Sequence, residues 1–248
     1  ANTTSGNLIA IGTSALLSNN GAGDNLAIGL QSATANTSGY HIVGIGNYSL
    51  CSNTTAQGNT AVGHSALKTT TTGAVNTAVG KNSLQANTTG ANNTAVGYDS
   101  LYTNTTGGNN VAMGCGALLL NSTGSNNIAI GLGSLCENTA SNNVAVGHLA
   151  LRTNTSGDCN VAIGTNALLA NTTASTQVAI GYNSLCRATT GHSNVALGLN
   201  SAPLLTTGVR NVAIGDQVMG SVTTGSYNTS LGYAAGYSLT TGSGNVLL

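Results

Sequence analysis

Hydrophobic and polar residues alternate in a short segment that returns along the whole chain. In one copy, residues 93–107, the sequence reads NTAVGYDSLYTNTTG, and its opening N-x-A-x-G pattern recurs every 17 residues. One step, from Gly131 to Gly147, is 16 residues long. Fourteen copies of one pattern predict a tandem-repeat architecture in place of one or two globular domains. The anchor glycines that end the pattern are Gly12, Gly29, Gly46, Gly63, Gly80, Gly97, Gly114, Gly131, Gly147, Gly164, Gly181, Gly198, Gly215 and Gly232.

Each copy predicts a short strand directly before its anchor glycine. An aliphatic residue precedes the glycine, and Ala stands two residues before it except at Gly44 and Ser230. Period-two alternation with β-branched residues is typical of a strand. After the glycine, Ser or Ala is usually followed by Leu, where we expect a second short strand. The copy closes with N-T-T-G or a variant, and Asn and Gly favour turns because both tolerate left-handed backbone.

Stacking of the copies is expected to make the fold. Seventeen residues cannot bury a core alone, but identical coils stacked on one another can. The sequence therefore predicts an all-β protein, a parallel β-solenoid or β-roll of about fourteen 17-residue coils with two short strands per coil. Residues 1–248 are expected to form a single solenoid, a segment of a longer fibre protein, with the 16-residue step in a loop.

Two columns of residues are expected to hold the coils together. Asn four residues before the anchor glycine can form a ladder of stacked amides, although it could also serve only to start the strand. Leu four residues after the glycine is expected to form the core. The Asn column contains Asn59, Asn76, Asn93, Asn110, Asn127, Asn143, Asn160, Asn194, Asn211 and Asn228. The Leu column contains Leu50, Leu67, Leu84, Leu101, Leu118, Leu135, Leu151, Leu168 and Leu185.

The two faces of the strand allow two arrangements. Alternation places Asn, Ala and Gly on one face and the aliphatic pair on the other. We expect the aliphatic pair to point inward, which leaves a flat Ala/Gly face for the close approach of a neighbour. In the opposite arrangement the aliphatic stripe is exposed and needs covering by other chains.

Composition and charge narrow the function. Five basic and five acidic residues balance, and no Lys/Arg cluster exists to neutralise phosphates, so we expect no nucleic-acid partner. No apolar run is long enough for membrane insertion. The four histidines and five acids are scattered, so we expect no metal, no cofactor and no enzymatic activity. The five cysteines include no C-x-x-C, and unpaired thiols favour assembly in a reducing cytoplasm.

The N-T-T turns also contain N-x-S/T sequons. Asn in such a sequence is either a turn former, which we favour, or a candidate glycosylation site that would help to solubilise an almost uncharged solenoid. The candidate positions are Asn36, Asn53, Asn87, Asn104, Asn121, Asn154 and Asn171.

The repeat unit resembles two kinds of surface protein. Residues 127–135, NIAIGLGSL, resemble the head repeats of YadA-like trimeric autotransporter adhesins. The longer unit ending in N-T-T-G is similar to repeats of phage and viral tail-fibre-type proteins. The resemblance covers essentially the whole chain and implies a left-handed parallel β-roll, commonly a homotrimer, exposed on a cell or virion and used for attachment.

These observations predict a structural role. The first hypothesis is a non-enzymatic β-solenoid segment of a virion or phage tail fibre, at the virion surface, self-associating as a homotrimer or filament and contacting a host-surface receptor or glycan. The alternative is the head of a bacterial cell-surface trimeric adhesin. A third hypothesis, an ice-binding solenoid, is based on the abundant threonines.

Overall fold

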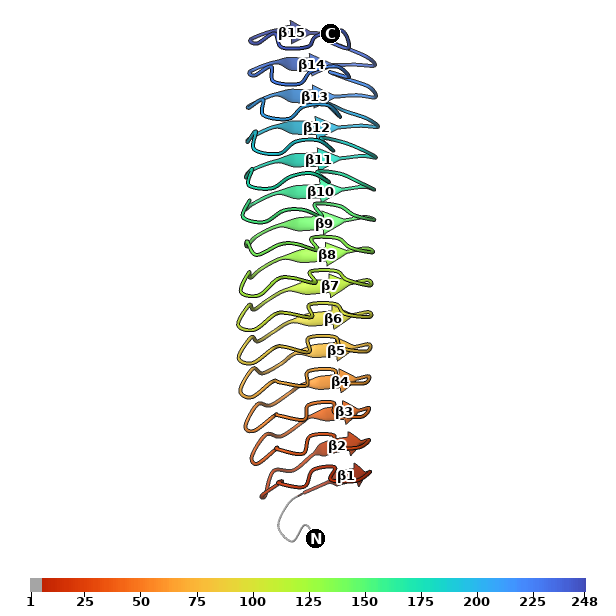
Figure 1. Ribbon diagram of the computed structural model, residues 1–248, viewed down its shortest axis with the longest axis vertical. Coiled ribbons are helices and arrows are strands. Elements are labelled where there is room, and N and C mark those ends of the chain that lie inside the picture. Colours follow the sequence, from red (N-terminus) through yellow and green to blue (C-terminus); the bar gives the residue numbers. More distant parts are fainter. Residues whose placement is uncertain (1–5) are drawn as a thin grey trace. The chain divides into compact units, whose positions relative to one another are not determined.

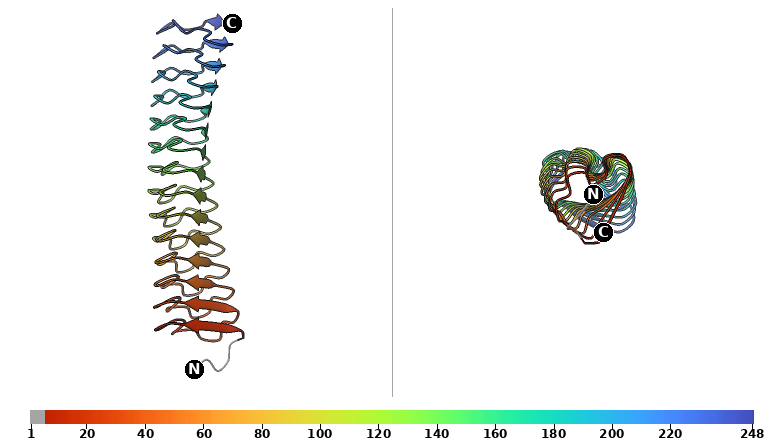
Figure 2. Two further views of the ribbon diagram at one scale, coloured as in Figure 1. Left: turned by 90° about the vertical axis from the view of Figure 1, so that its right-hand side faces the viewer. Right: turned by 90° about the horizontal axis from the view of Figure 1, so that it is seen from below.

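The computed structural model describes residues 6–248 and confirms an all-β parallel solenoid of about fourteen coils. The chain divides into two units, residues 1–126 and 127–248. In each unit the strands pair in parallel in chain order, one strand per coil (Figures 1 and 2). That residues 1–248 form a single domain stays a prediction.

The strands are short, mostly three residues. The first unit contains β1 (Leu8–Ile11), β2 (Asn25–Ile28), β3 (Val43–Ile45), β4 (Thr60–Val62), β5 (Thr77–Val79), β6 (Thr94–Val96) and β7 (Val111–Met113). The second unit contains β8 (Ile128–Ile130), β9 (Val144–Val146), β10 (Val161–Ile163), β11 (Val178–Ile180), β12 (Val195–Leu197), β13 (Val212–Ile214), β14 (Thr229–Leu231) and β15 (Val246–Leu247).

The register follows the sequence repeat. Ala78 pairs with Ala95, and Val161 pairs with Val178, so equivalent residues of successive coils lie directly above one another. The 16-residue step keeps this register, because Ala129 pairs with Ala145. The missing residue is therefore absorbed in the turn between β8 and β9, as predicted.

The second strand expected in each coil is not found among residues 6–248. The segment around the Leu column forms tight turns in which non-glycine residues adopt left-handed backbone; in one coil, φ is 53° at Asp99 and 50° at Leu101. Two left-handed residues so close together bend the chain sharply, which is incompatible with an extended strand. The Leu column therefore sits on a turn.

The expected orientation of the strand is also wrong. The alanines of the strands, such as Ala78 and Ala95, are fully buried, whereas Val79 and Val96 beside them are each 38% exposed. The close stacking of the coils also excludes a side chain at the anchor position: a Cβ added to Gly97, whose φ is 135°, would lie 2.7 Å from the carbonyl oxygen of Gly114 in the next coil. Small residues therefore face inward and the aliphatic pair faces solvent.

The leucines of the turns fill the interior. All nine members of the predicted Leu column are fully buried. In the coil after β12, Ala202 stands at this position and a buried Leu205 enters from the turn three residues later. In the coil after β13, Met219 and Val222 occupy the equivalent places and are also buried. The irregular coils thus fill the same interior from two positions instead of one.

Candidate interaction surface

The asparagines four residues before the anchor glycines point into the solenoid and hydrogen-bond along it. Asn93 donates its Nδ2 to Oδ1 of Asn76 at 3.1 Å, and its backbone N–H donates to the same oxygen at 2.9 Å. Asn110 repeats both bonds to Asn93. In the second unit, Asn211 and Asn228 are linked in the same way. All ten predicted members are buried, so these amides exchange solvent for one another.

The sequon asparagines form a second ladder that sequence reasoning missed. Asn104 donates its Nδ2 to Oδ1 of Asn87 at 2.9 Å, and Asn121 donates to Asn104 at 3.1 Å. In the second unit, Asn171 donates to Asn154 at 2.7 Å. The strict spacing of this Asn was the available signal, because a turn former alone need not recur in one column.

This burial argues against the glycosylation hypothesis. A glycan attaches to Nδ2 and needs that atom at the surface. In the fold, the side chains of all seven candidates are fully buried, and a glycan on any of them would occupy the interior. The candidates Asn36, Asn53, Asn87, Asn104, Asn121, Asn154 and Asn171 are therefore structural residues of the folded chain.

A stripe of mostly aliphatic side chains, interrupted by Thr60, Thr77 and Thr94, lies on the outward side of the strands, and we name it the outer aliphatic face. None of its residues carries a charge, and each is partly or largely exposed. In the first unit it consists of Leu26, Ile28, Val43, Ile45, Thr60, Val62, Thr77, Val79, Thr94, Val96, Val111 and Met113. In the second unit it consists of Ile128, Ile130, Val144, Val146, Val161, Ile163, Val178, Ile180, Val195, Leu197, Val212 and Ile214.

A polar and aromatic cluster lies on the turns next to this face in the first unit. The Nζ of Lys81 lies 5.7 Å from the ring centroid of Tyr98, and Asn82 donates its Nδ2 to Oδ1 of Asp99 at 3.0 Å. The negative charge of Asp99 raises the pKa of the Tyr98 phenol, because it opposes formation of a second negative charge. The positions directly after the anchor glycine vary between coils and can hold such groups without disturbing the interior.

Titratable groups elsewhere are dispersed. His41 and Asp24 form an exposed pair with Nε2 and Oδ2 3.6 Å apart. His64 packs edge-on against Tyr48, with ring centroids 5.8 Å apart. Within residues 6–248, no three His, Cys, Asp or Glu side chains lie together in a way that could hold a metal ion.

The cysteines are all thiols, and they differ in exposure. Cys115 and Cys159 are exposed, whereas Cys51, Cys136 and Cys186 are half-buried. Burial raises the pKa of the Cys136 and Cys186 thiols, an effect that the nearby arginines Arg152 and Arg187 only partly offset. Assembly of the protein in a reducing cytoplasm, which unpaired thiols favour, stays a prediction.

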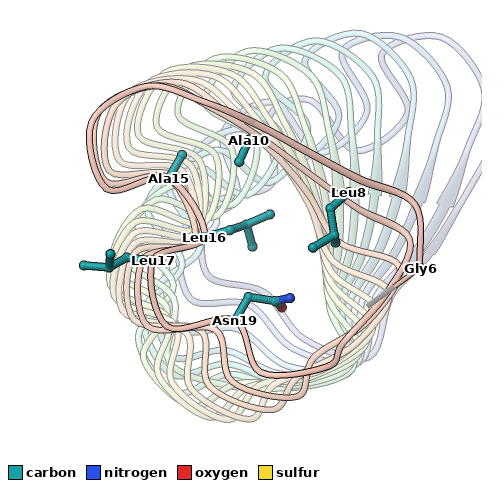
Figure 3. Close-up of a pocket in the computed structure, with 7 residues that line it drawn as sticks. All are labelled: Gly6, Leu8, Ala10, Ala15, Leu16, Leu17 and Asn19. Carbon is teal, nitrogen blue, oxygen red and sulfur yellow. The ribbon is translucent and has the colours of Figure 1, made fainter. Parts of the chain in front are cut away.

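A cavity of about 480 Å³ opens at the first described coil. Figure 3 shows Leu8, Ala10, Leu16 and Asn19 directed into it, whereas Leu17 points away. Apart from Leu17, the side chains around it belong mostly to the inward columns. The cavity is thus the interior of the coil seen from its end, and it is not a separate site in the wall.

The described residues include no helix with the length and apolar character needed to cross a membrane. The candidate interaction surface consists of the outer aliphatic face and the variable turn positions beside it. Comparison of the chain with protein-family models, with curated proteins and with solved structures finds no match.

Proposed function

We propose that the chain is a non-enzymatic structural segment of a virion or phage tail fibre that takes part in host adhesion, and that its copies associate through the outer aliphatic face. The association places the apolar stripes against one another and leaves the variable turn positions outward, where they contact the host. The proposal is supported by the sequence resemblance and by the arrangement of the exposed side chains.

The outer aliphatic face is the observation on which the proposal depends. Monomeric soluble proteins rarely expose contiguous apolar patches larger than a few hundred Å². Here two outward columns run along each unit; they are aliphatic except at Thr60, Thr77 and Thr94, and Val79, Val96 and Met113 are between 38% and 40% exposed. A surface of this kind gains free energy when another apolar surface covers it.

A second copy of the chain is the partner that fits this surface. Its side chains repeat every coil, about 4.8 Å apart along the stack, and only a partner with the same spacing can interdigitate over several coils. A second copy of the chain has the same spacing because it has the same repeat. The absence of charge on the face and the zero net charge of the chain leave little electrostatic repulsion between copies.

Light scattering after size-exclusion chromatography tests the proposal. The chain mass is 24.2 kDa, and the proposal expects a multiple of it, three-fold for a homotrimer or larger for a filament. Replacing Val79 and Val96 together by Lys places two charges on the face and should lower the mass to that of the monomer.

Matched changes on the turns serve as the control. Thr89 and Thr106 are exposed and belong to the coils of Val79 and Val96. Replacing both threonines by Lys adds the same charge away from the aliphatic face and should leave the mass unchanged. A monomer for the unmodified chain at micromolar concentration contradicts the proposal.

The trimeric adhesin head remains the alternative, with the same association surface on a bacterial cell. The adhesin and the fibre hypotheses predict different domains in the full-length protein. A secretion signal with a membrane-anchor domain supports the adhesin, and a particle-attachment or folding-chaperone domain supports the fibre.

Ice binding is a further candidate because of one local feature. Thr60, Thr77 and Thr94 occupy equivalent places on the outward side of β4, β5 and β6, and they pair in register. Such a regular array of hydroxyl and methyl groups on a sheet could order water. Inhibition of ice recrystallisation by the chain, lost when Thr77 is replaced by Lys, would favour this function over the fibre.

A further inference from the structure

A small pocket is set into the wall of the second unit where the repeat is irregular. Its volume is about 190 Å³, and it is lined by Asn200, Pro203, Gln217, Gly220 and Tyr237. These residues come from the turns of three successive coils, after β12, β13 and β14. The pocket is smaller than the roughly 300–1,000 Å³ typical of drug-sized ligand sites. It therefore has room for about one ring of a ligand.

The pocket exists because Gly220 replaces a side chain. Cys186, Pro203, Gly220 and Tyr237 occupy equivalent positions in four successive coils. Without a side chain at Gly220, the ring of Tyr237 extends over the vacant place: a Cβ added to Gly220 would lie 2.5 Å from Cε2 of Tyr237. The ring is still half exposed, so it forms a wall that a ligand can contact.

Two side-chain amides with unused hydrogen-bonding groups, those of Asn200 and Gln217, line the other side. Asn166 donates its Nδ2 to Oδ1 of Asn183 at 3.1 Å, and Asn183 donates to Asn200 at 3.2 Å. Gln217 occupies the next place in this column, but among residues 6–248 no hydrogen bond joins its side chain to Asn200. The Nδ2 of Asn200 and the whole amide of Gln217 are thus available to a ligand.

The chemistry of the lining indicates the ligand class. An exposed aromatic ring and a proline offer apolar surface, and the two amides offer donors and an acceptor. No charged side chain lines the pocket. A molecule with an apolar face and several neutral hydroxyl groups satisfies all of these groups at once. We propose that this pocket binds one neutral pyranose residue of a glycan, an inference that rests on the proposed attachment function and gives it a location.

Saturation-transfer NMR of the full chain tests the site. The probes are free glucose, galactose, mannose, N-acetylglucosamine and N-acetylgalactosamine, with N-acetylneuraminic acid as the acidic comparison. We expect transfer to the ring protons of at least one neutral sugar. Tyr237→Ala should raise its Kd by about tenfold or more, the effect of losing a central aromatic contact.

Further variants separate the contact from general damage. Gln217→Leu removes the amide. Leu is compatible with the left-handed backbone at this position, because Leu149 occupies the same column and both residues have a φ of 55°. It should also weaken binding. Tyr102→Ala removes a tyrosine from the column of Tyr237 in a regular coil and should leave the Kd unchanged.

Three results would overturn the inference: no transfer to any neutral sugar, transfer only to the acidic sugar, or a Kd unaffected by Tyr237→Ala. The outcome is separable from that of the proposed function. Light scattering in sugar-free buffer reports association through the outer aliphatic face alone, so a chain that assembles without binding sugar contradicts only the pocket. A monomer that binds a neutral sugar contradicts only the fibre association.

Discussion

Asn93 and Asn104 donate their side-chain amides to one acceptor, the carbonyl oxygen of Gly107, at 2.9 and 3.0 Å. Both asparagines belong to the same coil, Asn93 directly before its strand and Asn104 on its last turn. Each also donates along the stack, Asn93 to Asn76 and Asn104 to Asn87. In this coil the two ladders are therefore joined at a turn carbonyl, and the same junction occurs at Gly90 and Gly124.

Loss of one turn asparagine should be costly. Asn104→Ala removes the donor to Asn87 and the acceptor of Asn121, and it leaves a buried amide oxygen without a partner. We expect a loss of about 2–4 kcal/mol in the free energy of unfolding, from the unpaired polar group and the cavity. Urea denaturation followed by circular dichroism measures it.

Asn171 provides the matched comparison. Its Oδ1 is buried without a hydrogen-bond partner, because the next residue of the column is Ala188. Asn171→Ala removes that unsatisfied atom together with the donor to Asn154. The loss should be smaller than for Asn104→Ala. Both variants lose one donated ladder bond, so equal losses would show that the bond Asn104 accepts from Asn121 contributes nothing to stability.

Gln177 and Ala188 compensate each other in a single coil. Gln177 replaces the strand asparagine and donates its Nε2 to the carbonyl of Gly191, and Ala188 replaces the turn asparagine that would donate to the same oxygen. The longer Gln thus occupies space that a second amide fills elsewhere. Gln177→Asn alone should destabilise by leaving a cavity, and Ala188→Asn alone should destabilise by overpacking.

The double variant Gln177→Asn/Ala188→Asn restores the repeat pattern. It should be more stable than either single variant and at least as stable as the original chain, with a coupling energy of about 1–3 kcal/mol in the double-mutant cycle. Additive effects within about 0.5 kcal/mol would indicate that the two positions are independent.

The fold was predictable from the sequence because the repeat period determines which residues stack. The Asn and Leu columns were found in the same way. The orientation of the strand was not, because alternation defines two faces without saying which is inside, and hydrophobicity favoured the aliphatic one. A steric signal was present: the strand alanine is kept in nearly every coil, whereas the aliphatic places alternate among Val, Ile, Leu, Met and Thr. A position that holds a small residue in nearly every coil indicates that it faces the narrow interior.

The pocket beside Tyr237 lay beyond sequence reasoning for a different reason. Pro203 and Gly220 were visible as departures from the repeat, but a departure does not say whether space is filled or left open. That depends on where the ring of the following coil lies. The absence of a second strand has a similar cause, since the left-handed backbone at Leu101 is rare for leucine and has no compositional signal.

Anchor glycines should be the least tolerant positions. Gly97→Ala places a Cβ against the carbonyl oxygen of Gly114 and requires φ near 135°, which residues with a side chain rarely adopt. We expect a loss of about 3 kcal/mol or more, or failure to fold. Gly116 is the control: its φ is 63°, and nothing lies within 4 Å of an added Cβ. Gly116→Asn should change the denaturation midpoint little, because Asn tolerates this backbone, and a similar loss at both positions would contradict the steric argument.

The rate at which each cysteine is alkylated should reflect how deeply its thiol is buried in the fold. The thiolate is the nucleophile, and burial raises the pKa of Cys136 and Cys186, so a smaller fraction of each is ionised at a given pH than for an ordinary thiol. With iodoacetamide at neutral pH, we expect the exposed Cys115 and Cys159 to be alkylated first and the two half-buried thiols to react more slowly. Raising the pH towards the elevated pKa should accelerate alkylation of Cys136 and Cys186.

In denaturant, where burial is lost, the difference in rate between the cysteines should disappear. Mass spectrometry of peptides resolves each site, and equal native rates at Cys136 and Cys159 would show that the turns open faster than the reagent reacts.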